Sequence, residues 1–142
     1  MSPLRQQIIA AARTWCGTPY HHQASSRGVG CDCLGLIRGV YRDVFGPEPE
    51  NVPAYSMDWA IAEDSLRKAA CRHLEEIQIA DIKPGDVVLF KIRGAAARHA
   101  AIITQSDPHM MIHAYSGYTV REEALVRWKN YLAYAFRFPG VN

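Results

Sequence analysis

The chain has 142 residues, of which 49% are hydrophobic and 21% are charged. This is the composition of an ordinary globular domain and excludes an intrinsically disordered chain. The length predicts one domain over residues 1–142. Sixteen Lys and Arg against fourteen Asp and Glu give a net charge of only +2, which excludes a strongly basic nucleic-acid-binding surface, so we expect no nucleic-acid partner.

Neither export nor membrane insertion is predicted from the apolar segments. The longest apolar run near the N-terminus covers residues 8–12, shorter than the roughly 7–15 residues of a signal-peptide core. Nothing approaches the roughly 20 apolar residues of a membrane-spanning helix. We therefore expect a protein made in the cytoplasm without a signal peptide and with no membrane span.

The first half of the sequence predicts helices joined by one long loop. Ser2 is a suitable cap for a helix that ends near Gly17. Residues 17–30 are mostly small, polar or glycine, which is typical of a loop long enough to carry function. A second helix begins at Asp32 or Cys33, with Asp32 as its cap, and ends before Gly46. A third is predicted over residues 56–72.

The second half predicts strands. Lys83-Pro84-Gly85-Asp86 has the pattern of a type II turn, with Pro and Gly at its two central positions. Helices followed by a run of antiparallel strands define an α+β domain. The predicted strands cover residues 74–79, 87–92, 98–104, 110–115, 118–123 and 132–138.

Of the four cysteines, Cys33 has the position expected of a nucleophile. It lies in the first turn of a predicted helix, where backbone N–H groups and the helix dipole favour a thiolate. Cys16 and Cys71 lie near helix C-termini, where the dipole opposes a thiolate, and Cys31 precedes the cap. Without an export signal we expect no disulfides.

A metal site is an alternative use of the same cysteines. Cys31 and Cys33 could bind a metal together with His21 and His22. Zinc sites usually pair C-x2-4-C with a second spaced pair, and adjacent histidines chelate poorly. We therefore expect neither a metal nor another cofactor.

A thiol nucleophile needs a base, and that base needs an orienting group. His99 and His113 lie on consecutive predicted strands. Side chains alternate along a strand, so the two histidines share a face only for one parity of the strand register. The sequence does not determine that register, and Cys33, His99 and His113 are a candidate set.

Five segments in order resemble the NlpC/P60 cell-wall peptidases, a papain-like group. The resemblance covers about residues 8–138 and implies a papain-like fold with N-terminal helices packed on an antiparallel sheet. Residues 20–36 are most similar to the branch encoded with phage tails and gene transfer agents. The five segments are Gly17-Thr-Pro-Tyr20, Gly30-Cys-Asp-Cys33-Leu-Gly-Leu36, Lys83-Pro-Gly-Asp86-Val-Val-Leu-Phe90, His99-Ala-Ala-Ile-Ile103 and Ile112-His113-Ala114.

The resemblance implies a role for each matching residue. Cys33 would attack an amide carbonyl, His99 would be the base, and His113 would orient His99. Tyr20 matches a tyrosine that borders the site. The chain has Leu34 where the family usually has serine, a change that leaves the nucleophile and the following glycine in place.

The implied substrate is the stem peptide of peptidoglycan, cleaved between D-γ-glutamyl and meso-diaminopimelate. Three residues are candidates for contacting it. Arg27 could pair with a substrate carboxylate, and His22 could line the cleft entrance. Asp32 is foremost a helix cap and could also contact the loop.

The leading hypothesis is a cysteine endopeptidase carried in a phage-like tail, with tail-hub or baseplate proteins as partners. Such an enzyme would act in the recipient periplasm, where it would open the cell wall locally. One alternative keeps the Cys–His–His set but makes the protein an amidase or acyltransferase, because papain-like folds host several such reactions. The other is a structural tail-hub module whose site is unused.

Overall fold

The computed structural model describes residues 1–50 and 64–142. Its helices are α1 (Pro3–Thr14), α2 (Cys33–Phe45) and α4 (Ser65–His73). The Ser2 hydroxyl accepts a hydrogen bond from the Arg5 N–H at 3.3 Å, so α1 begins at the predicted cap. The third predicted helix is present but begins at Ser65, because Asp64 has a left-handed backbone with φ +50° and is the N-cap. Residues 56–63 of that prediction lie outside the described residues.

The central element is a six-stranded antiparallel sheet in the order β3-β8-β4-β5-β6-β7. Every predicted strand corresponds to one of its strands, although β3, β4 and β6 are shorter than predicted and β7 begins later. The α+β prediction is confirmed. The strands are β3 (Glu75–Ile77), β4 (Val87–Phe90), β5 (His99–Gln105), β6 (Met110–His113), β7 (Arg121–Ala124) and β8 (Leu132–Arg137).

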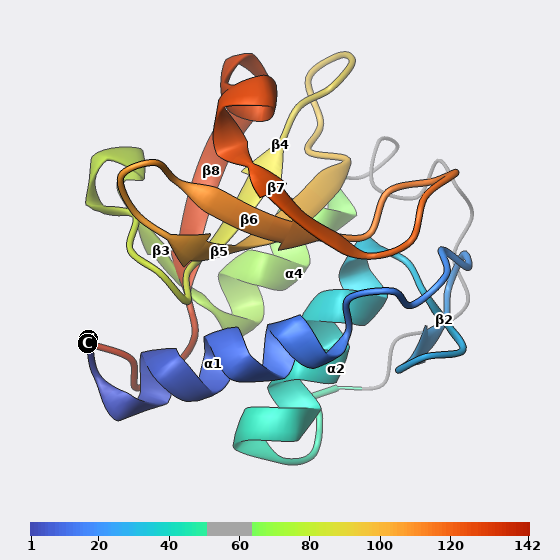
Figure 1. The fold of residues 1–142 in the computed structure, drawn as a ribbon. Coiled ribbons are helices and arrows are strands. Elements are labelled where there is room, and N and C mark those ends of the chain that lie inside the picture. Colours follow the sequence, from blue (N-terminus) through green and yellow to red (C-terminus); the bar gives the residue numbers. More distant parts are fainter. Residues whose placement is uncertain (51–63) are drawn as a thin grey trace.

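The helices cover one face of this sheet (Figure 1). Ile8 of α1, Leu36 of α2 and Leu66 of α4 belong to one buried cluster with Leu89 and Ile102 of the sheet. Since side chains alternate along each strand, the intervening residues form a second cluster on the other face. There they pack under a 3-10 helix over residues Leu125–Tyr131, which the sequence did not predict.

The loop before α2 is fastened to that helix by close packing at Gly35. A Cβ at Gly35 would lie 1.9 Å from the Ala24 carbonyl oxygen, so only glycine fits. Gly39, one turn later, makes room for the Trp15 ring, which a Cβ at this position would overlap. Within the loop, β1 (Ser25–Ser26) and β2 (Gly30–Cys31) form a short antiparallel pair.

A buried ion cluster fastens the first helix to the sheet. Asp86 follows the predicted turn, in which the Asp86 N–H donates to the Lys83 carbonyl and Gly85 has φ +97°. Its fully buried carboxylate binds Arg5 of α1 at 3.0 Å and Arg137 of β8 at 2.9 Å. Burying these charges is tolerable because they pair with each other.

The described helices give no indication of membrane insertion. Across residues 1–50 and 64–142, none combines the length and the apolar character needed to cross a bilayer.

Candidate active site

Cys33 is the first residue of α2, and Asp32 fixes where that helix begins. The Asp32 Oδ1 accepts a hydrogen bond from the Gly35 N–H at 2.7 Å, which makes Asp32 a true N-cap. Its Oδ2 accepts from the Gln23 N–H at 2.8 Å. The buried Asp32 carboxylate therefore binds both the first turn of α2 and the preceding loop. Cys33 lies at the junction of the two.

The Cys33 thiol lies against the start of β5. Burial, followed by the negative charge of Asp32, raises the pKa of Cys33 to about 12, while hydrogen bonds from the backbone N–H groups of Ala100, Leu34 and Cys33 oppose the rise. The backbone N–H groups at the helix start thus favour the thiolate, as expected, but desolvation outweighs them and the pKa of Cys33 is raised. A largely protonated thiol needs a nearby base, and Ala100 directly follows His99.

The strand register places His99 and His113 on the same face of the sheet. Ile102 pairs with Ile112, and Ile103 with Met111. Continuing this register sets His113 opposite Ala101, and His99 lies two residues before Ala101. The parity that the sequence left open is therefore the one that brings the two imidazoles together.

The two imidazoles are in direct contact. The His99 Nε2 lies 2.8 Å from the His113 Nδ1. Both rings are buried, with 4% of His99 and 0% of His113 exposed, and the Trp128 ring lies 5.3 Å and 5.1 Å from them between centroids. Burial, assisted by His113, lowers the pKa of His99 to about 3. His99 is therefore neutral at pH 7, as a base must be.

Beyond His113 lies a carboxylate that the sequence analysis did not identify. The His113 Nε2 lies 2.8 Å from Glu123 Oε2. Burial lowers the pKa of His113, whereas the hydrogen bond and charge of Glu123 raise it, with a lowered net result. Glu123 lies in β7, next to β6. Only the register of β6 and β7 could have revealed it.

Tyr20 lies close enough to Cys33 for the charge of the thiolate to affect the phenol. It forms a parallel β-bridge with Cys31, which sets it next to the start of α2. Burial and the charges of Cys33, Asp32 and Cys31 raise the pKa of Tyr20 to about 12. The phenol is therefore protonated at neutral pH and remains a hydrogen-bond donor.

Arg27 is not brought to this site. Its guanidinium donates to Asp43 at 3.0 Å and to the Thr14 hydroxyl at 3.0 Å, and it lies 5.6 Å from the Trp15 ring. Asp43 is about 15 Å along α2 from Cys33 at 1.5 Å per residue. The prediction that Arg27 contacts substrate beside the nucleophile therefore has no support in the geometry.

The other two predicted substrate contacts lie together. The His22 Nδ1 is 3.8 Å from the Asp32 Oδ2, so His22 lies beside the cap of the nucleophile's helix. The Asp32 carboxylate is buried and already accepts from two backbone N–H groups. Its position indicates a structural role, and His22 is the better placed of the two for contact with a ligand.

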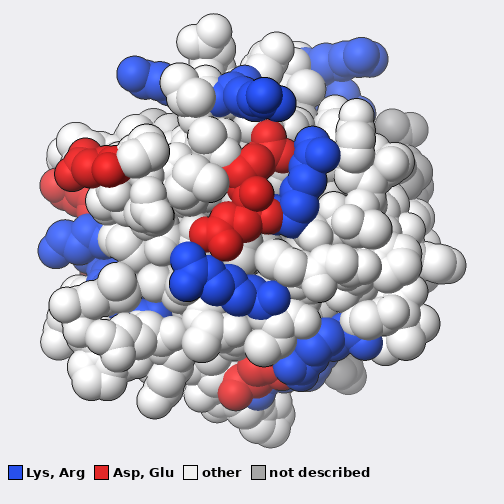
Figure 2. Space-filling view, viewed as in Figure 1, with Lys and Arg blue, Asp and Glu red and all other residues white. Residues whose placement is uncertain are grey.

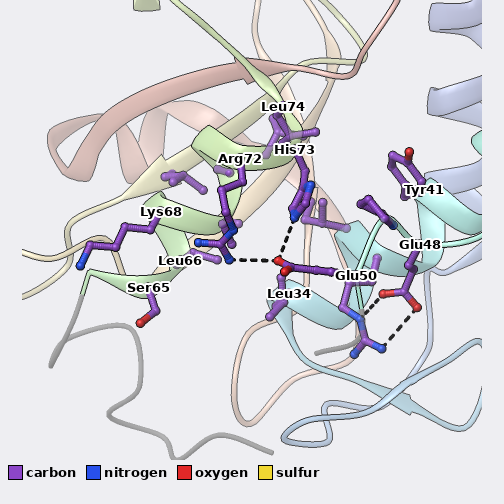
Figure 3. Close-up of a pocket in the computed structure, with 18 of the residues that line it drawn as sticks. Leu34, Tyr41, Glu48, Glu50, Ser65, Leu66, Lys68, Arg72, His73 and Leu74 are labelled. Carbon is purple, nitrogen blue, oxygen red and sulfur yellow. Dashed lines mark hydrogen bonds and ion pairs between the residues drawn. The ribbon is translucent and has the colours of Figure 1, made fainter. Parts of the chain in front are cut away.

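A pocket of about 410 Å³ opens between α2 and α4. Figure 3 shows Glu50 bound by Arg72 and His73 within it, with Leu34 nearby. Leu34 and Ala100 both line this pocket, and their N–H groups also contact the Cys33 sulfur. Leu34, the departure from the family pattern, therefore provides an apolar wall next to the nucleophile.

Charged groups outside the site are of both signs. Figure 2 shows acidic side chains in the middle of one face, bordered by Lys and Arg. Among the described residues, no three His, Cys, Asp or Glu are grouped so as to hold a metal ion.

Residues 17–137 match the NlpC/P60 family. The chain belongs to that family, whose members are mostly cysteine peptidases that hydrolyse peptidoglycan, although some are non-catalytic. None of the curated proteins compared with the chain matches it.

Solved NlpC/P60 structures have the same fold. The NlpC/p60 domain of the peptidoglycan hydrolase SagA is 24% identical, with a TM-score of 0.64, and the match covers 94% of this chain and 98% of that one. NlpC2 from Trichomonas vaginalis is 20% identical, with a TM-score of 0.70, over 97% of this chain but 47% of that one. The present chain thus spans less than half of that protein.

One structural neighbour is catalytically inactive. RipD from Mycobacterium tuberculosis, described as a non-catalytic NlpC/p60 domain protein adapted to peptidoglycan binding, is 15% identical with a TM-score of 0.61. The match covers 96% of this chain and 98% of that one. Membership of the family therefore does not establish catalysis, and the case for it must come from the residues of the site.

Proposed function

We propose that this protein is a cysteine endopeptidase that cleaves the stem peptides of peptidoglycan. The observation that carries the proposal is the arrangement of Cys33, His99 and His113. The thiol contacts the N–H of the residue next to His99, and His99 is hydrogen-bonded to His113 at 2.8 Å. This is the nucleophile, base and orienting group that a thiol hydrolase requires.

The reaction would proceed by acyl transfer through the thiol. As Cys33 attacks the amide carbonyl, its proton passes to His99, and the resulting imidazolium gives that proton to the leaving amine. The carbon–nitrogen bond breaks and a thioester remains on Cys33. Water, deprotonated by His99, then hydrolyses the thioester. The N–H of Cys33 and the Tyr20 hydroxyl are the candidate donors to the oxyanion.

We assign the scissile bond to D-γ-glutamyl–meso-diaminopimelate. The support for this bond is membership of the family and the presence of the Asp32-Cys33 and His99 segments. We further propose that the enzyme is carried in a phage-like tail or a gene transfer agent, with tail-hub or baseplate proteins as partners, and that it acts in the recipient periplasm. The support is the similarity of residues 20–36 to that branch. Mass spectrometry of purified particles would test the assignment, which fails if the chain is absent from them.

The enzymatic proposal is tested by digestion of purified peptidoglycan. Reduced protein is incubated with diaminopimelate-type peptidoglycan, and the released fragments are identified by mass. The wild type and a C16S control, which alters an exposed thiol, should release products of D-γ-glutamyl–diaminopimelate cleavage, and C33A should release none.

The remaining outcomes contradict parts of the proposal. Cleavage at another amide would retain the nucleophile and overturn the assigned bond. Loss of cleavage in C16S as well as in C33A would overturn the assignment of Cys33. No cleavage by the wild type, together with slow alkylation of Cys33, would indicate a non-catalytic binding or structural module.

A further inference from the structure

Glu123 occupies a position from which it can act on the base through His113. On β7 it pairs with Met111, and Arg121 pairs with His113. Residues 121 and 123 therefore share the face of the sheet that carries His113. The Glu123 side chain is only 14% exposed, so the contact between its carboxylate and the imidazole is largely shielded from water.

Within residues 1–50 and 64–142, the Glu123 carboxylate forms hydrogen bonds with three side chains, each of which can donate a hydrogen. Its Oε2 lies 2.8 Å from the His113 Nε2 and accepts from the Arg121 Nε at 2.8 Å. Its Oε1 accepts from the Trp128 Nε1 at 3.3 Å. Burial raises the pKa of Glu123, but the hydrogen bond and charge of His113 and hydrogen bonds from Trp128 and Arg121 outweigh burial and lower it. Glu123 is therefore ionised at neutral pH and can only accept.

An obligate acceptor at this place determines where each proton lies. Because the Glu123 carboxylate only accepts, neutral His113 must carry its proton on Nε2, and its Nδ1 is then a lone pair. That lone pair must receive its hydrogen from the His99 Nε2, 2.8 Å away. Neutral His99 is thereby held with a free Nδ1, which is the nitrogen able to take a proton from a thiol.

We propose that Glu123 is a positioning residue that selects the reactive tautomer of His99 through His113. The inference rests on the proposed function, because it makes a four-residue relay of Cys33, His99, His113 and Glu123. Glu123 also places a negative charge where the His99–His113 pair becomes cationic as His99 takes the proton. A neutral acceptor at this position would select the tautomer of His99 but would not stabilise the cationic pair.

Three variants separate these effects. E123Q retains an oxygen acceptor and removes the charge, and E123L removes both. E122Q is the matched control, because Glu122 pairs with Ile112 of the opposite face and binds Arg13 and Thr104 instead. We expect E123L to lower kcat/KM about ten- to a hundredfold, as when outer groups that orient a functional histidine are removed. E123Q should retain more activity than E123L, and E122Q should equal the wild type.

Two readouts do not depend on cleavage of any substrate. Nitrogen-15 NMR of the histidine rings should show single Nε2–H tautomers for His99 and His113 in the wild type and E122Q, and mixed tautomers in E123L. Alkylation of Cys33 by iodoacetamide at pH 7, in a background without Cys16 and Cys71, should be slower in E123L and E123Q. It should recover at high pH, where the thiol ionises without His99.

The outcomes also separate this inference from the proposed function. If E123L leaves both the tautomers and the alkylation rate of folded protein unchanged, the relay is wrong. If they change as expected but the wild type cleaves no peptidoglycan, the relay stands and the endopeptidase assignment fails. If E123Q is as impaired in kcat/KM as E123L while the tautomers stay single in E123Q, the charge matters and the acceptor does not, which overturns tautomer selection as the reason.

Discussion

Asp32 connects the stability of α2 with the reactivity of Cys33, and two substitutions separate these roles. D32A removes the acceptor of the Gly35 N–H, which is a helix cap, and the acceptor of the Gln23 N–H. Loss of the cap costs about 0.5–2 kcal/mol, whereas Gln23 is an exposed residue, so its N–H can bind water in place of the carboxylate. We expect D32A to lower the free energy of unfolding by about 0.5–2 kcal/mol. D32N retains one acceptor and should lie between D32A and the wild type.

Substitution of Asp32 should make the Cys33 thiol more reactive, although it makes the fold less stable. The Asp32 charge contributes to the raised pKa of Cys33, so D32N should lower that pKa and speed alkylation of Cys33 at pH 8. Urea denaturation measures the first effect, and iodoacetamide kinetics in a C16S/C71S background measure the second. D43N, a similar change at the far end of α2, should leave the alkylation rate unchanged. Slower alkylation in D32N, or a stability loss in D32A below about 0.5 kcal/mol, would refute this account of Asp32.

Three further predictions concern stability. G35A should destabilise the fold by more than the usual 1–3 kcal/mol of overpacking, because its Cβ would overlap the Ala24 carbonyl; a thermal melt that matches the wild type would contradict this. D86A should lower the free energy of unfolding, measured in urea, by about 3–5 kcal/mol, because it leaves buried Arg5 without its carboxylate partner. An unchanged urea midpoint would contradict this. The pKa of His99 is lowered from 6.5 to about 3, so unfolded protein binds a proton that folded protein does not. Unfolding free energy should therefore fall below pH 6.5 by up to about 1.4 kcal/mol per unit, less steeply in H99N.

Local patterns were sufficient for the helices, the strands and the place of Cys33 at a helix N-terminus. Asp32 precedes an apolar stripe of helical spacing, and this arrangement alone places Cys33 in a first helical turn. Alternating apolar segments gave the strands, because period two is a property of neighbouring residues. The 3-10 helix at residues 125–131 has no comparable signal, since its side chains are chosen by what they cover on the sheet.

The parts that could not be predicted depend on pairing between distant segments. His99 and His113 meet only in one register, and nothing local distinguishes it from a register shifted by one residue. Glu123 resembles an ordinary charged residue of an edge strand until β7 is aligned with β6. Arg27 was assigned to the cleft because its loop borders α2, but its partner Asp43 lies at the other end of the helix.

The connectivity of the relay has a consequence for folding. Three consecutive strands joined by short turns carry His99, His113 and Glu123. Contacts among these residues therefore close only small loops, and the conformational entropy lost on loop closure is modest. Cys33 belongs to α2, far away in sequence, and contacts the Ala100 N–H of β5 only when that helix docks on the strand. His99, His113 and Glu123 can therefore come together early in folding. Cys33 joins them through a contact between residues distant in sequence, and such contacts form more slowly. Reactivity of the thiol should accordingly appear late in refolding, after the strand meander has formed.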